Sequence, residues 1–193
     1  MTESTRIMAW GVAAMAALVA ASNVLVRYPV GDFLTWGAFT YPFAFLATDV
    51  VNRRCGAPAA RRVVLVGFAL AVALSVWLAT PRIAVASGAA FLTAQLLDVA
   101  VFDRLRAGRW WRAPLASSVI GSAVDTALFF TLAFSAGAGF LGPDEPWALA
   151  AAPLMGLGPP APFWVSLALG DFGVKLAIAA LALGPYRLAT RGA

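Results

Sequence analysis

Polar side chains interrupt the long apolar runs of this chain in groups that share a helical face. A charged side chain near the centre of a membrane helix costs about 2.5–3.5 kcal/mol, so each group is a candidate functional site. Residues three, four or seven apart lie on one face of a helix. The groups are Asp49 with Asn52, Gln95 with Asp98, Asp171 with Lys175, and Ser118 with Ser122 and Asp125, and Asn23 stands alone near the end of the first apolar run.

The residue types limit the chemistry of such a site. The chain has no histidine and one cysteine, Cys55, which excludes histidine acid-base catalysis, histidine-ligated metals and an intramolecular disulfide. A carboxylate accepts two parallel hydrogen bonds, and an amide both donates and accepts. These groups would satisfy the edge of a guanine-like base, although cations, amino acids or polyols could use them too. The aromatic residues that could stack on such a ring are Trp36, Tyr41, Phe45, Phe102 and Phe129.

Structural roles compete with these functional ones. Asp171 and Lys175 could form an internal ion pair that lowers the insertion cost of both. Serines in spans often serve helix packing, and Asp49 with Asn52 could cap a helix end. Asp98 and Asp125 are harder to explain structurally, because the spans contain no further lysine or arginine to neutralise both. We therefore expect these two to serve a polar ligand or a proton.

Composition identifies the solvent around the helices. Hydrophobic residues make up 62% of the 193 and charged residues 12%, against about 45–50% and about 25% in soluble domains. The predicted fold class is therefore an all-α polytopic membrane protein. The net charge of +5 does not indicate nucleic-acid binding, because the basic residues occur in short clusters between apolar runs.

Six apolar runs are long enough to cross the roughly 30 Å hydrocarbon core of a bilayer. They predict transmembrane helices over residues 7–26, 33–51, 63–79, 83–102, 114–137 and 162–184. The first run could be read as a signal peptide, but the apolar segments that follow favour an uncleaved helix. With no long linker visible, residues 1–193 are expected to form a single transmembrane domain.

The positions of the basic residues predict the orientation. Six spans place eleven arginines on the side of the two termini and only Arg27 and Arg82 on the other, while Lys175 lies within a span. By the positive-inside rule, both termini are then expected in the cytoplasm. The chain itself is expected in the cell inner membrane. The segment 139–160 becomes an extracytoplasmic loop, with the apolar piece 147–157 expected as an interfacial or re-entrant segment.

Several motifs resemble the queuosine precursor transporter family, also called the vitamin uptake transporter family. In the second span, the stretch from Tyr41-Pro42 through Asp49 to Asn52 and Gly56 is similar to the family's motif. Arg82-Ile83 with Gln95-Leu96-Leu97-Asp98, Asp125-Thr126 with Phe129, and Lys175 with Pro185-Tyr186 resemble its later helices. The resemblance covers most of residues 23–186. One departure is Arg53, because the family pattern often has Glu directly after the Asn.

The resemblance implies a permease that imports 7-cyano-7-deazaguanine, a guanine analogue, without a cofactor or metal. Its expected partners are this small molecule and the lipid bilayer, and a homo-oligomer is compatible with the sequence. The expected substrate-binding residues are Asn23, Tyr41, Phe45, Asp49, Asn52, Gln95, Asp98, Ser122, Asp125 and Lys175.

Two other functions compete with this carrier. The chain could be the substrate-binding membrane subunit of an ATP-driven vitamin importer, and its size suits this role. It has no P-loop with which to use ATP itself. It could also be a membrane enzyme acting on a lipid, but the lack of histidine and of an Asp-rich Mg²⁺ motif counts against this. We expect no enzymatic activity.

Overall fold

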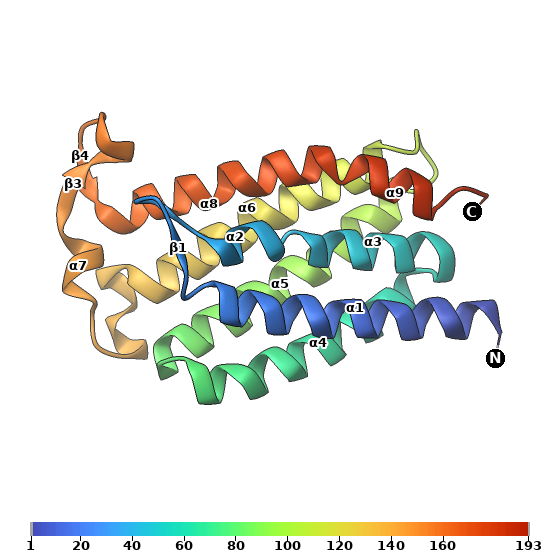
Figure 1. Ribbon diagram of the computed structural model, residues 1–193, viewed down its shortest axis with the longest axis horizontal. Coiled ribbons are helices and arrows are strands. Elements are labelled where there is room, and N and C mark those ends of the chain that lie inside the picture. The colour runs from blue at the N-terminus through green and yellow to red at the C-terminus, as the bar shows by residue number, and fades with distance from the viewer. Residues whose placement is uncertain (1, 193) are drawn as a thin grey trace.

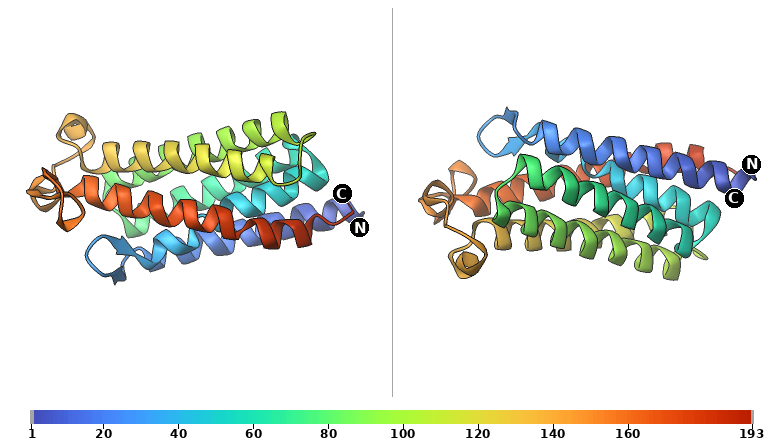
Figure 2. Two further views of the ribbon diagram at one scale, coloured as in Figure 1. Left: turned by 90° about the horizontal axis from the view of Figure 1, so that it is seen from above. Right: turned by 90° about the horizontal axis from the view of Figure 1, so that it is seen from below.

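The computed structural model describes residues 2–192 as a bundle of helices that lie side by side along one axis (Figure 1). Both termini are at one end of the bundle, called here the terminal end. The other end, called here the far end, carries two small β-hairpins and a short helix (Figures 1 and 2). The long helices are α1 (Glu3–Leu25), α3 (Phe43–Cys55), α4 (Ala57–Leu78), α5 (Pro81–Leu105), α6 (Arg112–Phe134) and α8 (Phe163–Leu181).

Five segments of the described chain are long and apolar enough to cross a membrane. They are Glu3–Leu25, Ala57–Ser75, Pro81–Leu105, Arg112–Phe134 and Phe163–Ala189, the last comprising α8 and α9 (Leu183–Ala189). Each of these segments overlaps one of the predicted spans over most of its length. The all-α class is confirmed for the membrane-spanning part, and the far end adds only hairpins of two- and three-residue strands.

The remaining predicted span, 33–51, is a broken helix. It begins with β2 (Leu34–Thr35), which pairs with β1 (Pro29–Val30), and continues as α2 (Trp36–Thr40) and then α3. Pro42 has no N–H to continue the helical hydrogen bonds. The helix resumes with hydrogen bonds that span three residues instead of four, from Ala44 N to Tyr41 O at 2.9 Å and from Phe45 N to Pro42 O at 3.2 Å. Both residues of the break keep right-handed helical dihedrals, so α3 still follows α2 closely.

Helix ends follow from local sequence. Thr80 caps α5 by accepting a hydrogen bond from Ile83 N at 3.4 Å, and Pro81 occupies the first turn, where its missing N–H costs nothing. α3 ends at Gly56, whose φ of 83° suits a residue without a Cβ. One apolar core joins α1, α3, α4 and α5 around Met15 and Val51.

The segment 136–162 includes the piece 147–157 that the sequence predicted as interfacial or re-entrant, and it consists of several short elements. It is divided into η1 (Ala136–Leu141), α7 (Pro146–Leu149), β3 (Ala151–Pro153), η2 (Leu154–Gly156) and β4 (Pro160–Pro162). Gly142 follows η1 and Gly156 ends η2, both with a positive φ, whereas α7 is followed by three alanines. β3 pairs with β4, and Met155 N donates to Ser166 Oγ at 3.0 Å, which fastens the hairpin to α8.

Candidate functional site

A cavity of about 480 Å³ enters the bundle from the far end. Its mouth is formed by exposed residues of the first hairpin, including Pro29, Gly31 and Asp32, and it reaches inward to Asp125 and Lys175. This volume lies in the range of about 300–1,000 Å³ that small-molecule sites occupy. Seven aromatic side chains besides Tyr41 line its walls, namely Phe33, Phe91, Phe129, Phe130, Phe134, Trp147 and Phe163.

An ion cluster forms the floor of this cavity. Lys175 Nζ lies 2.7 Å from Asp125 Oδ2 and 2.5 Å from Asp171 Oδ2, and it also donates to Thr126 Oγ1 at 3.0 Å. Tyr41 donates its hydroxyl to Asp125 Oδ1 at 3.1 Å. Two carboxylates thus share one ammonium group, which leaves acceptor capacity for a ligand that brings its own donors.

Three helical segments bring the ion cluster together. Asp171 and Lys175 are one turn apart on α8, while Asp125 and Thr126 come from the buried face of α6. Tyr41 stands at the break between α2 and α3, and Lys175 Nζ lies 5.4 Å from the centre of its ring. Tyr41 thus contributes a hydroxyl group to the cavity floor from the segment where α2 meets α3.

A second polar group, called here the inner cluster, is buried between α3, α5 and α6. Thr48 Oγ1 donates to Gln95 Oε1 at 3.1 Å, and Asn52 Nδ2 donates to Val99 O at 3.1 Å. Between these two bridges lie Asp49, 1% exposed, and Asp98, 0% exposed. Ser117 Oγ donates to Asp49 Oδ1 at 3.3 Å.

The inner cluster contains unusual unpaired atoms. Among the described residues, neither carboxylate oxygen of Asp98 has a hydrogen-bond partner, and the same holds for Gln95 Nε2, Asn52 Oδ1 and Ser122 Oγ. Buried polar atoms in proteins are nearly always paired, so each exception calls for an explanation.

A small cavity of about 10 Å³ lies between the inner cluster and the ion cluster. Asp49 lines one side and Lys175 another, with the hydroxyl groups of Ser118, Ser122 and Tyr186 around it. Its size matches about one water molecule. The two polar groups are thus separated by a space that a single water molecule would fill.

The structure divides the ten predicted site residues into two sets. Asn23, Tyr41, Asp125 and Lys175 line the large cavity. Phe45, Asp49, Asn52, Gln95, Asp98 and Ser122 do not; they are buried toward the terminal end, at or beside the inner cluster. The predicted common face of Ser118, Ser122 and Asp125 is buried as a whole.

The aromatic residues proposed for stacking are also divided. Phe129 lines the cavity, and Tyr41 does so with its hydroxyl bonded to Asp125. Phe45 is 1% exposed inside the bundle, Phe102 packs against Tyr186 with ring centres 6.1 Å apart, and Trp36 is 53% exposed beside Phe39.

Sequence reasoning missed several cavity residues. Asp171 was interpreted as the ion-pair partner of Lys175, which it is, and was left out of the site although it also lines the cavity. The i, i+4 spacing was the signal that could have included it. The aromatic wall comes from five separate segments, so no spacing in the sequence reveals it.

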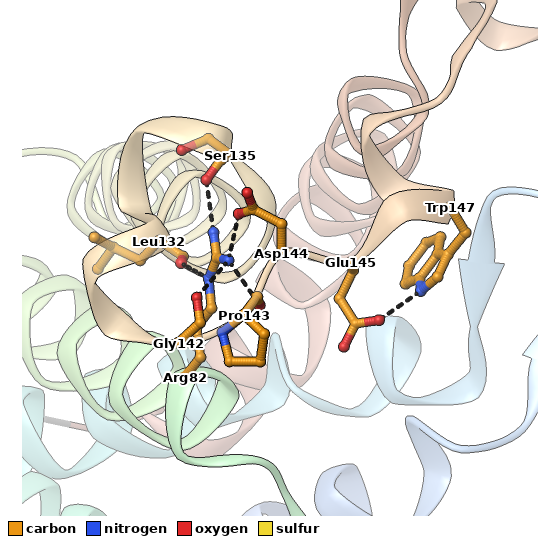
Figure 3. Close-up of polar contacts among 8 residues, drawn as sticks. All are labelled: Arg82, Leu132, Ser135, Gly142, Pro143, Asp144, Glu145 and Trp147. Carbon is orange, nitrogen blue, oxygen red and sulfur yellow. Dashed lines mark hydrogen bonds and ion pairs between the residues drawn. The ribbon is translucent and has the colours of Figure 1, made fainter.

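Arg82 holds the far end together next to the cavity (Figure 3). It is 3% exposed, and its guanidinium donates to Ser135 O at 2.6 Å, Leu132 O at 3.0 Å and Asp144 Oδ1 at 2.8 Å, with further bonds to the carbonyls of Gly142 and Pro143. Glu145 next to Asp144 accepts a bond from Trp147 Nε1 at 3.0 Å, which orients an indole of the cavity wall (Figure 3).

Arginines also join the helices at the terminal end. Arg53 donates to Arg106 O at 2.5 Å, and Arg106 donates back to Arg53 O at 2.9 Å, so that α3 and α5 are fastened at their ends. Arg54 donates to Ala189 O at 2.8 Å and pairs with Glu3 at 3.4 Å. The arginine that departs from the family pattern, Arg53, therefore has a structural partner here.

Comparisons with known proteins connect this geometry to a family. Residues 35–80 and 75–189 match the family model described as "Putative vitamin uptake transporter". The chain belongs to this family. It is similar to the "Queuosine precursor transporter" of Escherichia coli (strain K12), at 42% identity over 141 residues, 61% of this chain and 64% of that protein. It is also similar to the "Probable queuosine precursor transporter" of Haemophilus influenzae (strain ATCC 51907 / DSM 11121 / KW20 / Rd), at 37% identity over 153 residues, 61% of this chain and 65% of that protein.

The aligned region spans less than two thirds of the length of each relative. No solved structure matches the chain. Membership of a transporter family, together with five apolar helices of spanning length, identifies a multi-pass membrane protein rather than a member of an enzyme family.

Proposed function

We propose that this chain carries a queuosine precursor of the 7-deazaguanine class, such as 7-cyano-7-deazaguanine, across the cell inner membrane. Family membership and the names of the two relatives support a carrier of this kind. The main structural support for this proposal is the large cavity, which has an aromatic wall and an ion cluster as its floor.

The chemistry of that cavity suits a guanine-like ring. Such a ring presents two neighbouring N–H donors beside a carbonyl acceptor. The carboxylates of Asp125 and Asp171 accept hydrogen bonds, while Lys175 and the hydroxyl of Tyr41 donate them. The flat faces of the heterocycle would pack against the phenyl rings of the wall, which bury its apolar surface.

The proposed orientation makes this an outward-facing conformation. Residues 36–55 form a helical segment of about 30 Å at 1.5 Å per residue, so the broken α2–α3 segment serves as the sixth crossing. The positive-inside rule then places the terminal end in the cytoplasm and the cavity mouth outside. Broken helices near the middle of a membrane commonly form substrate sites in carriers.

In this conformation, the proposed substrate contacts are Asn23, Tyr41, Asp125 and Lys175, with Asp171 added to them. The inner residues Phe45, Asp49, Asn52, Gln95, Asp98 and Ser122 lie below the cavity. They would meet the substrate only after the helices rearrange.

The first test is uptake of labelled 7-cyano-7-deazaguanine by the purified chain in liposomes. Wild type should give saturable uptake that unlabelled substrate competes away and a pyrimidine base does not. Asp125→Asn should lower uptake by about tenfold or more, because hydrogen bonds to a charged group contribute about 1.5–3 kcal/mol. The matched control, Asp103→Asn, changes an acid that is 46% exposed at the terminal end and should leave uptake unchanged.

Wild-type uptake equal to that of empty liposomes, from protein that is folded and inserted, would contradict the proposal. The same assay decides the alternative that the sequence left open. Uptake by the isolated chain without ATP would exclude a strict need for an ATPase partner.

A further inference from the structure

The inner cluster brings two acids together without a cation between them. Asp49 on α3 and Asp98 on α5 lie within hydrogen-bonding reach of each other, bracketed by the Thr48–Gln95 and Asn52–Val99 bridges. Both side chains are at least 99% buried. Two carboxylates this close in a medium of low dielectric cannot both remain ionised without a compensating charge.

Within residues 2–192, no basic side chain forms an ion pair with either acid. On α8, Lys175 lies across the small cavity and is already bonded to Asp125 and Asp171. On α9, Tyr186 lines that cavity and brings a neutral hydroxyl group, and α6 contributes Ser117. Arg53 and Arg106 are bonded to each other's backbone at the terminal end. The remaining charged side chains on the neighbouring helices α1 and α4 are all exposed, namely Glu3, Arg6, Arg61 and Arg62.

The unpaired atoms indicate which ion the two acids would bind. Two ionised carboxylates are acceptors only, so neither can bond to the other, and both oxygens of Asp98 are unpaired among the described residues. One proton placed between the two acids turns this contact into an O–H···O hydrogen bond. A hard metal cation would need about six or more oxygen ligands, and residues 2–192 contain no cluster of acids that could hold a metal.

A route for the proton is present in the same region. The small cavity joins Asp49 to Lys175, and the unpaired Ser122 Oγ lies at its edge, in a space that fits about one water molecule. Lys175 itself faces the large cavity. A proton that enters from the far end can therefore pass from the ion cluster to Asp49 through hydroxyl groups and one water molecule.

From this geometry we propose that Asp49 and Asp98 together form a proton-binding site that couples substrate movement to a proton gradient. The coupling rests on the proposed carrier function, whereas the proton site can be measured without substrate. The sequence placed both acids among the substrate-binding residues and left open that Asp98 serves a proton. The proposal assigns both to the coupling ion.

The proton site is tested by infrared spectroscopy on the purified protein without substrate. A protonated carboxylic acid has a carbonyl-stretch band apart from those of carboxylates and backbone amides. Wild type should show this band and lose it as the pH is raised. Asp98→Asn and Asp49→Asn should each remove it, while Asp103→Asn, an acid one helical turn beyond the pair and exposed, should retain it. Absence of the band in wild type near neutral pH, where exposed acids are ionised, or its survival there in both variants, would overturn the proposal.

Coupling is tested in liposomes with a pH gradient across the membrane. If one proton accompanies each substrate molecule, a gradient that is acidic on the cavity side should increase accumulation by up to about tenfold per pH unit. Uptake that does not depend on the pH gradient, or that depends on a Na⁺ gradient instead, would overturn the proposed proton coupling. The proposed carrier function would not be affected by this result. Conversely, an infrared band without any uptake would support the proton site and contradict the carrier function.

Discussion

Lys175 is the only lysine in the chain, and it lies between two acids from different helices. Its side chain is 4% exposed, and those of Asp125 and Asp171 are 7% and 15% exposed. Breaking a buried ion pair by removing one partner costs about 3–5 kcal/mol, because the remaining charge is left uncompensated. The ammonium group therefore has a structural role in addition to any contact with a substrate.

Lys175→Met should lower the thermal midpoint of the protein in detergent, because it leaves two buried carboxylates without a cation. The double variant Lys175→Met with Asp125→Asn restores the original net charge of the ion cluster and should recover part of that loss. Uptake should be low in both, since the ammonium donor of Lys175 is gone. A single variant as stable as wild type would show that the ion pair contributes nothing to the fold.

At this scale, sequence predicted the partners along one helix and missed those across helices. The i, i+4 spacing of Asp171 and Lys175 predicted their ion pair, and the structure confirms it. That Asp125 also joins Lys175 depends on how α6 packs against α8, which no local spacing reveals. For the same reason, the sequence indicated that Asp98 serves a polar ligand or a proton, but it did not reveal Asp49 as its neighbour.

Close approach between helices sets the position of the inner cluster. Gly121 on α6 faces Phe45 on α3, and a Cβ placed there would lie 2.9 Å from Phe45 Cε1 and 3.4 Å from Ala94 O on α5. Phe45 is 1% exposed, and the space beside it is the small cavity of about 10 Å³ that it helps to line. Gly121 therefore allows α6 to approach both α3 and α5, which brings Ser117 on the same helix within reach of Asp49.

Gly121→Ala should destabilise the protein by about 1–3 kcal/mol through overpacking, less the gain of up to about 1 kcal/mol that alanine brings to a helix. Gly173→Ala is the matched control, because a Cβ on that α8 glycine meets nothing within 4 Å. It should leave the thermal midpoint equal or slightly higher. Equal midpoints for both variants would mean that the contact at Gly121 relaxes without cost.

The helices themselves were more predictable than the break within one of them. Apolar length alone predicted five of the elements, since the backbone of a membrane helix must satisfy its own hydrogen bonds. The run 33–51 was predicted as one span, and Pro42 at its centre was the available signal for a break. The cavity mouth was not predictable, because its hairpin and the segment 136–162 fold through contacts with α5 and α8, such as those of Arg82 and Ser166.

At the scale of the whole molecule, the two ends differ in a way that suits a carrier. The far end admits a cavity to the ion cluster, while the terminal end is fastened by reciprocal arginine contacts and by the buried Phe102–Tyr186 pair. Transport then requires that the terminal end open as the far end closes. The bonds from Arg53 and Arg106 go to backbone carbonyls, so they can be exchanged for water without leaving a buried charge.

The orientation of the two ends of the bundle relative to the membrane is tested by cysteine labelling in intact spheroplasts with a membrane-impermeant maleimide. Cys55 is first changed to serine, and single cysteines are placed at Ser4, Leu188 and Leu157, all exposed. Leu157→Cys at the far end should react from outside, because the arginine distribution puts that end opposite the cytoplasm. Ser4→Cys and Leu188→Cys should react only after permeabilisation. An odd number of crossings would instead put Ser4 and Leu188 on opposite sides, and the broken α2–α3 segment would then not span the membrane. A reversed pattern would make the cavity mouth cytoplasmic, and the conformation described here would be the one that releases substrate into the cell.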